Sequence, residues 1–160
     1  MSELTVTRGL PACGKTTRAR AWVAEDRARR ARDNRDDLRD MLDDGQFVQG
    51  VTEARVLAAR DALILALLAK GLDVICDDTN LPAGTAWDLK QLAAVFGAEF
   101  TVIDMTDVPL ALCMARDADR AGPRRVGRSV IRGMQERYLD GQPYPLPVPG
   151  RDPRRPEAKR

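Results

Sequence analysis

The stretch TRGLPACGKTTRAR, from Thr7 to Arg20, decides the fold of this chain. Within it, GLPACGKT fits the pattern G-x-x-x-x-G-K-[ST] at every required position. Glycines let the backbone bend so that successive N–H groups point at phosphates, and the helix that follows adds its positive N-terminal end. The apolar run Leu4–Thr7 before the pattern indicates a buried strand, and the apolar spacing after Lys15 indicates a helix. The stretch therefore predicts a nucleotide-binding loop between a strand and a helix.

The loop pattern also predicts the cofactors. In such a loop the Lys15 ammonium reaches the β- and γ-phosphates, and the Thr16 hydroxyl ligates Mg²⁺. We therefore expect ATP, or another nucleoside triphosphate, together with Mg²⁺. The residues expected to contact the nucleotide here are Gly9, Pro11, Ala12, Cys13, Gly14, Lys15, Thr16 and Thr17.

Length and composition are typical of a globular protein with one domain. The chain has 160 residues, and its 26 basic and 24 acidic side chains leave a net charge of +2. Three scattered cysteines without a CxxC pair are typical of reduced thiols, so we expect a cytoplasmic protein and no zinc site. No apolar run approaches the roughly 20 residues that span a bilayer, and the N-terminus has no secretory signal pattern. We expect no membrane contact.

Strands and helices are predicted to alternate along the chain. Besides Leu4–Thr7, the expected strands cover residues 72–78 and 99–105, and the expected helices begin at 15, 52, 82, 109 and 129. An Arg-rich segment, RARRARDN, occupies the place of a second strand, so the bounds of that strand stay open. The alternation predicts an α/β fold with a central parallel sheet and helices on both faces. The domain is expected to span residues 1–142, and the Pro/Arg-rich tail 143–160 to be extended or disordered.

The class of nucleotide-binding protein follows from the other motifs. The chain lacks the NKxD of a guanine-specific switch and the strand ending in DE of a translocating ATPase, so a small kinase fits best. Because there is no histidine, a carboxylate has to take the proton of an acceptor hydroxyl. The segment DNRDDLRDM (33–41) offers four carboxylates within eight residues, and chemistry alone does not choose among them.

Several ordered motifs resemble one known family, the kinase half of the bacteriophage polynucleotide 5′-kinase/3′-phosphatases. GLPACGKTT is followed by NRDDLR, by DDTNL at 77–81, by DVPLALCMARDADR at 107–120 and by VGRSVIR at 126–132. The resemblance covers roughly residues 4–144 and implies a P-loop NTPase/kinase fold with an Arg-bearing lid. It also implies transfer of the γ-phosphate of ATP to the 5′-hydroxyl ends of DNA or RNA. No DxDGT motif occurs, so a 3′-phosphatase activity is not implied.

On the acceptor side, the resemblance assigns roles residue by residue. It makes Asp36 the general base and Arg39 the clamp on the 3′-side phosphate of the acceptor. Asp78 and Thr79 would line the acceptor site, with Asp78 also beside the metal ion near Thr16. Val126 is expected among the substrate contacts as well.

On the lid, the resemblance assigns a pair of arginines. Arg116 and Arg120 are four residues apart, so they share one face of a helix. Arg120 would neutralise the transferred phosphoryl group, and Arg116 would lie near the nucleotide. The expected catalytic residues are thus Lys15, Asp36 and Arg120. The following segment AGPRRVGR (121–128) suits either a mobile lid or a nucleic-acid contact.

Two other functions stay open at this point. The first is a P-loop kinase of a small hydroxyl acceptor such as a nucleoside, a sugar or an antibiotic. The second is a nucleotide-gated module that binds nucleic acid through its arginine clusters without catalysis. A preference for DNA or RNA, the choice of triphosphate and the oligomeric state do not follow from the residues.

Overall fold

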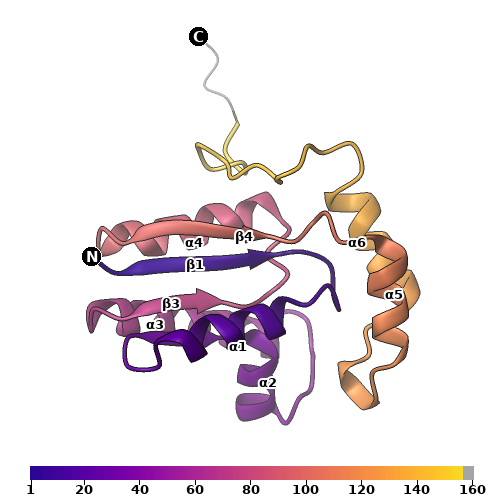
Figure 1. The fold of residues 1–160 in the computed structure, drawn as a ribbon, viewed down its shortest axis with the longest axis horizontal. Coiled ribbons are helices and arrows are strands. Elements are labelled where there is room, and N and C mark those ends of the chain that lie inside the picture. Colours follow the sequence, from indigo (N-terminus) through magenta and orange to yellow (C-terminus); the bar gives the residue numbers. More distant parts are fainter. Residues whose placement is uncertain (157–160) are drawn as a thin grey trace.

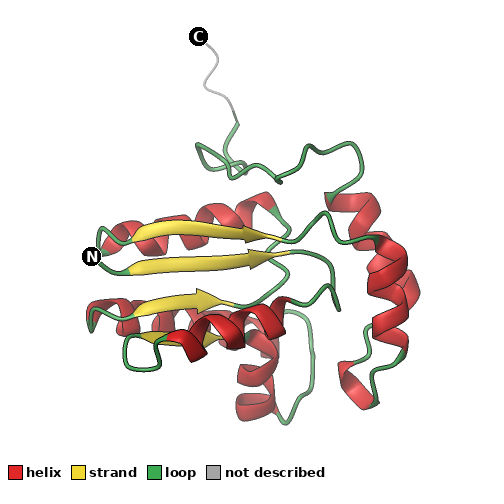
Figure 2. Ribbon diagram, in the orientation of Figure 1, coloured by secondary structure: helices red, strands yellow, loops and turns green. Residues whose placement is uncertain are grey.

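A four-stranded parallel sheet forms the centre of the computed structural model, which describes residues 1–156 (Figures 1 and 2). The strand order is β2-β3-β1-β4. The strands are β1 (Glu3–Arg8), β2 (Arg30–Asp33), β3 (Asp73–Cys76) and β4 (Glu99–Asp104). The helices are α1 (Lys15–Glu25), α2 (Arg35–Asp43), α3 (Thr52–Ala69), α4 (Ala83–Val95), α5 (Leu110–Ala118) and α6 (Arg128–Tyr138), with a short 3₁₀ turn η1 (Gly122–Arg124). The predicted parallel sheet is confirmed.

Apart from α2, which packs against α3, the helices form three groups around the sheet. Helix α1 covers one face, and α3 and α4 cover the other (Figure 1). Helices α5 and α6 pack against each other beyond the carboxyl ends of the strands. This edge is where ligands gather in open α/β sheets, because the loops that follow the parallel strands meet there. Within residues 1–156, none of the helices is long and apolar enough to cross a membrane.

Strand β2 forms despite its arginines. It is an edge strand that pairs in parallel with β3, with Arg30 opposite Asp73 and Asp33 opposite Cys76. Arg30 stacks over the ring of Trp22 in α1 at 4.5 Å. A polar sequence can form this strand because its arginines, which share one face, contact other residues. Its bounds could therefore not be predicted from apolar residues alone.

Two apolar clusters hold the layers together. The first joins β1 and β3 to α3 and α4 and consists of Leu4, Val6, Ile64, Leu68, Val74, Cys76, Leu89 and Ala93. The second lies under the nucleotide-binding loop and fastens α5, α6 and the tail to it. It consists of Leu10, Cys13, Leu81, Cys113, Met114, Ile131, Leu139 and Leu146. The second cluster thus ties the elements of the strand-end edge into one unit.

Arg8, the last residue of β1, is buried and fastens the tail to the sheet. Its Nε donates to the carbonyl of Asn80 at 2.9 Å, and its Nη1 donates to the carbonyls of Leu146 and Pro147 at 3.0 Å each. Asp104, opposite Arg8 in β4, accepts a hydrogen bond from the N–H of Leu146 at 2.6 Å. The tail up to residue 156 contains no helix or strand, yet Leu146 is buried in the second cluster. This part of the tail therefore packs on the domain.

Replacing Arg8 by methionine is expected to destabilise the fold by about 3–5 kcal/mol, because the carbonyls to which this buried guanidinium donates lose their hydrogen-bond donor. Chemical denaturation measures this loss. The exposed Arg29, replaced in the same way, serves as the control and should change the free energy of unfolding by less than about 0.5 kcal/mol. A loss below about 1 kcal/mol for Arg8→Met would contradict the prediction.

Candidate active site

The nucleotide-binding loop runs from the end of β1 to the start of α1 and turns tightly. Gly14 adopts a φ of +107°, a conformation that side chains disfavour. At Gly9 a Cβ atom would lie 2.6 Å from Cys13 Sγ and 3.0 Å from the carbonyl oxygen of Met105. Only glycine fits at that position. The backbone N–H groups of the loop and the first turn of α1 are therefore arranged to receive an anion.

The residues predicted for the loop lie together in the structure. Lys15 is buried, and its Nζ reaches back across the loop to donate to the carbonyls of Leu10 at 2.6 Å and Gly9 at 3.1 Å. The N–H of Gly9 donates to the carbonyl of Thr79 at 3.1 Å, which fastens the start of the loop to the segment after β3. Pro11, Ala12 and Cys13 are buried, whereas Thr17 is exposed.

The side chain that contacts Thr16 is Asp77, the residue after β3. Burial raises the pKa of Asp77, while hydrogen bonds from Arg32 and from the Thr16 hydroxyl lower it, and burial prevails. Asp77 Oδ2 accepts from Arg32 Nε at 2.8 Å, and the buried Oδ1 has no hydrogen-bond partner of good geometry within residues 1–156. Hydroxyl and carboxylate oxygens are the ligands that Mg²⁺ prefers. Thr16 and Asp77 therefore fit this cofactor.

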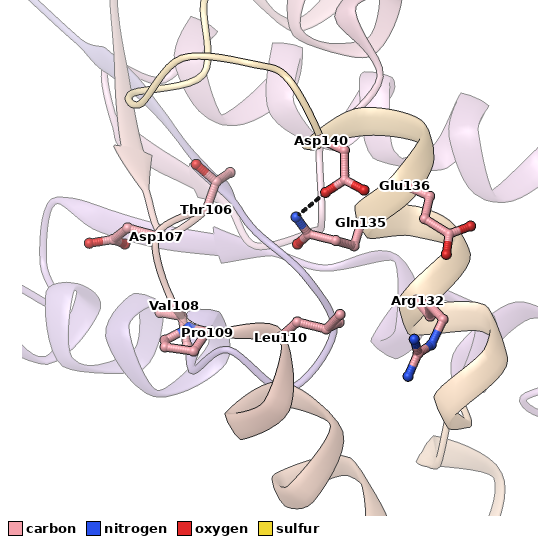
Figure 3. A pocket seen from close by; sticks show the side chains of 9 residues that line it. All are labelled: Thr106, Asp107, Val108, Pro109, Leu110, Arg132, Gln135, Glu136 and Asp140. Atoms are coloured by element: carbon pink, nitrogen blue, oxygen red, sulfur yellow. Dashed lines mark hydrogen bonds between the residues drawn. The ribbon is translucent and has the colours of Figure 1, made fainter.

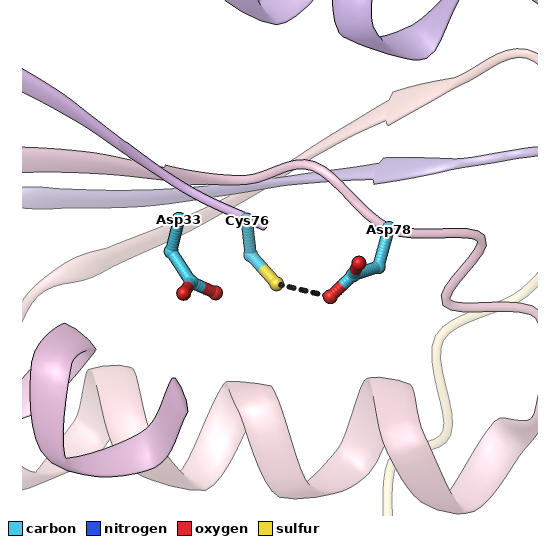
Figure 4. Close-up of side chains that lie close together, drawn as sticks. All are labelled: Asp33, Cys76 and Asp78. Carbon is cyan, nitrogen blue, oxygen red and sulfur yellow. Dashed lines mark hydrogen bonds between the residues drawn. The ribbon is translucent and has the colours of Figure 1, made fainter. Parts of the chain in front are cut away.

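Asp78 was predicted beside the metal ion, but the partner of its carboxylate in the structure is Arg35 of α2. Asp78 Oδ1 accepts from the N–H of Arg35 and its Oδ2 from Arg35 Nε, both at 3.1 Å. Asp33 and Cys76 lie beside it, with ligating atoms within 4.8 Å of one another (Figure 4). Arg60, itself buried, already supplies a positive charge to this cluster. We assign no metal ion to it.

Asp33 is the most perturbed carboxyl group of this cluster. Burial, followed by the nearby charge of Asp78, raises its pKa from 3.8 to about 7, although Arg60 opposes the shift. Neither of its oxygens has a hydrogen-bond partner of good geometry in the described part of the chain. Between pH 4 and 7 the folded protein therefore keeps a proton that the unfolded chain has lost.

Because of this retained proton, the stability that Asp33 contributes is present at low pH and falls as the pH rises to 7, by about 1.4 kcal/mol per pH unit. Asp33→Asn stays neutral at every pH and should remove this slope from urea unfolding curves measured between pH 4 and 7. The exposed Asp119, changed to asparagine, should leave the slope as in the wild type. Parallel curves for Asp33→Asn and the wild type would show that Asp33 is charged throughout.

Helix α2 presents the predicted base and phosphate clamp together. Asn34 caps the helix by accepting the N–H of Asp37 at 3.0 Å, which sets the start of α2 directly after β2. Asp36 is exposed, and its Oδ1 accepts from Arg39 Nη1 at 2.5 Å. Arg39 also binds Glu53 of α3. The three side chains form one cluster at the carboxyl end of the sheet.

The predicted lid follows α5, and we define it as residues 119–127. Arg116 Nη1 donates to the carbonyl of Cys13 at 3.4 Å, so this arginine lies on the nucleotide-binding loop. Arg120 is 40% exposed and lies 3.7 Å from Asp117. The buried Asp117 accepts the N–H of Val126 at 3.0 Å, and the Val126 side chain packs against the second apolar cluster. The base of the lid is therefore fixed, whereas Arg120 faces solvent.

Arg124 of η1 connects the lid to α2. Its Nη2 lies 2.8 Å from Asp40 and 3.4 Å from Asp37. Asp37 in turn binds Arg32, which also holds Asp77. An alternating chain of charges thus runs from the lid to the carboxylate beside Thr16. The lid segment and the helix that carries Asp36 form two sides of the same region.

A polar pocket of about 420 Å³ lies elsewhere on the strand-end edge (Figure 3). The loop after β4 and one flank of α6 form its walls, and Gln135 donates a hydrogen bond to Asp140 at 2.7 Å within it. None of the residues predicted for the active site lines this pocket. The candidate active site is instead the surface between the nucleotide-binding loop, α2 and the lid.

A comparison with models of known protein families identifies the family of this chain. Residues 4–140 match the family model of the AAA domain (AAA_33). The chain belongs to this family. This AAA domain has the P-loop NTPase fold, which its parallel sheet and its loop between β1 and α1 already indicated. A search of curated proteins found no match.

Solved structures resemble this AAA domain over most of its length. The chain in a Pnkp1/Rnl/Hen1 complex is 27% identical with a TM-score of 0.65, and the match covers 72% of this chain and 38% of that one. A Pnkp1/Rnl/Hen1 RNA repair complex gives 23% identity and a TM-score of 0.70, over 84% of this chain and 44% of that one. The chain thus spans less than half the length of these two relatives. The resemblance to a polynucleotide kinase domain is confirmed at the level of the fold.

An APS kinase shares the fold. The APS kinase CysC of Mycobacterium tuberculosis, in complex with AMPPNP and APS, is 21% identical with a TM-score of 0.60. The match covers 74% of this AAA domain and 69% of CysC. At this identity the likeness shows the fold alone. The P-loop kinase fold is therefore established, and the acceptor is a separate question.

Two residues of the site were missing from the sequence-based prediction. Asp77 precedes the predicted Asp78, and the alternation of an extended segment could have indicated that only one of them faces Thr16. Glu53 lies in the first turn of α3, outside every motif, and no sequence signal marks it.

Proposed function

We propose that this AAA domain is a polynucleotide 5′-hydroxyl kinase, which transfers the γ-phosphate of ATP to the 5′-hydroxyl end of DNA or RNA. The observation that carries the proposal is the contact between Asp36 and Arg39 on α2, at the edge where the nucleotide-binding loop lies. A carboxylate that takes a proton and a guanidinium that holds a phosphate match an acceptor with a 5′-hydroxyl and a 3′-side phosphate. The motifs NRDDLR and DDTNL support this acceptor.

The nucleotide is bound by the loop from Gly9 to Thr17. Its tight backbone at Gly9 and Gly14 fits phosphate oxygens, and Lys15 lies within the loop to contact the β- and γ-phosphates. Thr16 and Asp77 are proposed to hold Mg²⁺, directly or through water. An ion held by these two residues would supply positive charge that offsets the charge of the phosphates.

The remaining steps belong to side chains of the acceptor site and the lid. Asp36 accepts the proton of the 5′-hydroxyl as that oxygen attacks the γ-phosphorus in line with the leaving β-phosphate oxygen. Lys15 and Arg120 balance the charge on the transferred phosphoryl group, and Arg116 contacts the nucleotide from α5. Arg39 orients the acceptor by its phosphate. We propose that Asp78, Thr79 and Val126 complete the acceptor side, with Asp78 acting through the Arg35 that it holds.

A transfer assay with γ-labelled ATP tests the proposed function. The acceptors are an oligonucleotide with a 5′-hydroxyl, a nucleoside 3′-phosphate and a plain nucleoside, each with and without Mg²⁺. We expect Mg²⁺-dependent label on the first two. Label on the plain nucleoside alone would indicate a kinase of small hydroxyl acceptors. Binding of the oligonucleotide without any label would indicate a binding module. Lys15→Met is the control that should lose transfer to every acceptor.

A further inference from the structure

Arg39 is held in one orientation by Glu53. Its Nε donates to Glu53 Oε2 at 2.8 Å and its Nη2 donates to Oε1 at 2.6 Å, so one edge of the guanidinium meets the carboxylate through two parallel hydrogen bonds. This bidentate arrangement fixes both the position and the plane of the guanidinium. The Arg39 Cζ also lies 5.5 Å from the centre of the Phe47 ring, which covers one side of that plane.

The remaining edge of Arg39 faces the proposed base. Nη1 donates to Asp36 Oδ1 at 2.5 Å. The two ends of this network differ in their exposure to water, since the side chains of Arg39 and Glu53 are 15% and 16% exposed while that of Asp36 is 64% exposed. The inner pair is therefore the fixed one, and the outer pair is open to an incoming group.

Glu53 is suited to hold this position permanently. Burial opposes its charge, but the hydrogen bonds and charge of Arg39, with the charges of Arg35 and Arg60, keep the pKa of Glu53 below its usual value. It stays ionised, and its Oε1 also lies 3.4 Å from Arg35 Nη1. Because Glu53 lies in the first turn of α3, its bonds to Arg39 connect α2 to the helices that cover one face of the sheet.

We propose that Glu53 is the positioning residue of the acceptor site, and that it leaves Arg39 Nη1 to exchange the Asp36 carboxylate for a phosphate oxygen of the acceptor. Before the acceptor binds, Arg39 Nη1 is hydrogen-bonded to Asp36 Oδ1, so this carboxylate oxygen is occupied. The 3′-side phosphate takes over Nη1 and releases Asp36 next to the 5′-hydroxyl. The inference rests on the proposed function and deepens it, because acceptors with that phosphate are selected over the same acceptors without it.

The test compares two variants that each break one ion pair between α2 and α3. Glu53→Gln removes the charge that holds Arg39, whereas Arg55→Gln breaks the pair between Arg55 and Asp43 and does not touch Arg39. We expect Glu53→Gln to raise the KM for a nucleoside 3′-phosphate at least tenfold, to reduce its preference over the plain nucleoside by a similar factor, and to leave the KM for ATP unchanged. Arg55→Gln should behave as the wild type.

The outcomes separate this inference from the proposed function. Suppose first that the wild type is active. The role of Glu53 is overturned if both variants have equal KM values for the acceptor, or if Glu53→Gln keeps the acceptor preference of the wild type. Either result leaves the kinase function standing. If the wild type transfers no phosphate, binding of a nucleoside 3′-phosphate is measured by calorimetry. Affinity lost in Glu53→Gln and kept in Arg55→Gln would then support the positioning role although the kinase function had failed. Equal affinities in both variants would overturn the role. Thermal unfolding of both variants confirms that they fold.

Discussion

Asp36→Asn is expected to lower kcat for 5′-hydroxyl phosphorylation by about 10²–10⁴-fold, the usual contribution of a general base. The amide keeps the shape of the side chain but cannot take the proton. Because Asp36 lies on α2 and not on the nucleotide-binding loop, the affinity for ATP should stay within twofold of the wild type. Steady-state kinetics with a 5′-hydroxyl oligonucleotide and a separate nucleotide-binding titration measure the two effects.

The control for this variant comes from the same helix. Asp44, the exposed residue at the C-cap of α2, adopts a left-handed conformation that asparagine tolerates, so Asp44→Asn should keep full activity. If Asp36→Asn retained more than about a third of the wild-type kcat, the proton would have to leave by another route. The assignment of the base would then move to another carboxylate of the segment 33–41.

Arg120→Ala is expected to lower kcat by about 10³-fold or more, because a lid arginine that meets the transferred phosphoryl group stabilises charge that exists only in the transition state. The side chain is 40% exposed and makes only long contacts, with the Asp117 carboxylate at 3.7 Å and the Arg124 carbonyl at 3.4 Å, which a bound triphosphate can replace. Arg120→Lys should recover only part of the rate, since a lysine lacks the planar fork. Single-turnover measurements separate this effect from binding.

A neighbouring lid arginine provides the comparison for Arg120. Arg125 is exposed on the same segment, and Arg125→Ala removes the same charge from the lid. It should change kcat by less than about threefold. Equal losses in both variants would mean that the lid acts through its total positive charge and that no single arginine meets the phosphoryl group.

Much of the fold could be predicted from local patterns. The motif from Gly9 to Thr16 predicts the loop, and runs of apolar residues predict the strands before and after it. Gly71 and Gly97, which adopt positive φ, predict the ends of α3 and α4. Strand β2 was harder to predict, because its stability comes from contacts of Arg30 and Arg32 with distant residues. Strands are recognised in a sequence by the spacing of their apolar residues, and this edge strand has few apolar residues.

The candidate site could be predicted only in part, for a physical reason. Asp36 and Arg39 are close in sequence, so helix geometry alone brings them together. Glu53 meets Arg39 only because α2 and α3 pack side by side, and the choice between Asp77 and Asp78 depends on which face of the segment turns toward α1. Contacts made across elements carry no signature in a single sequence.

The contact of Arg124 with α2 has a consequence for the working conditions of the protein. All three side chains, Arg124, Asp37 and Asp40, are about half exposed to water. Dissolved ions weaken such pairs, with a screening length of about 8 Å at physiological ionic strength. Low ionic strength therefore favours the contact between the lid and α2, and high salt weakens it, so ionic strength sets how readily these two elements separate.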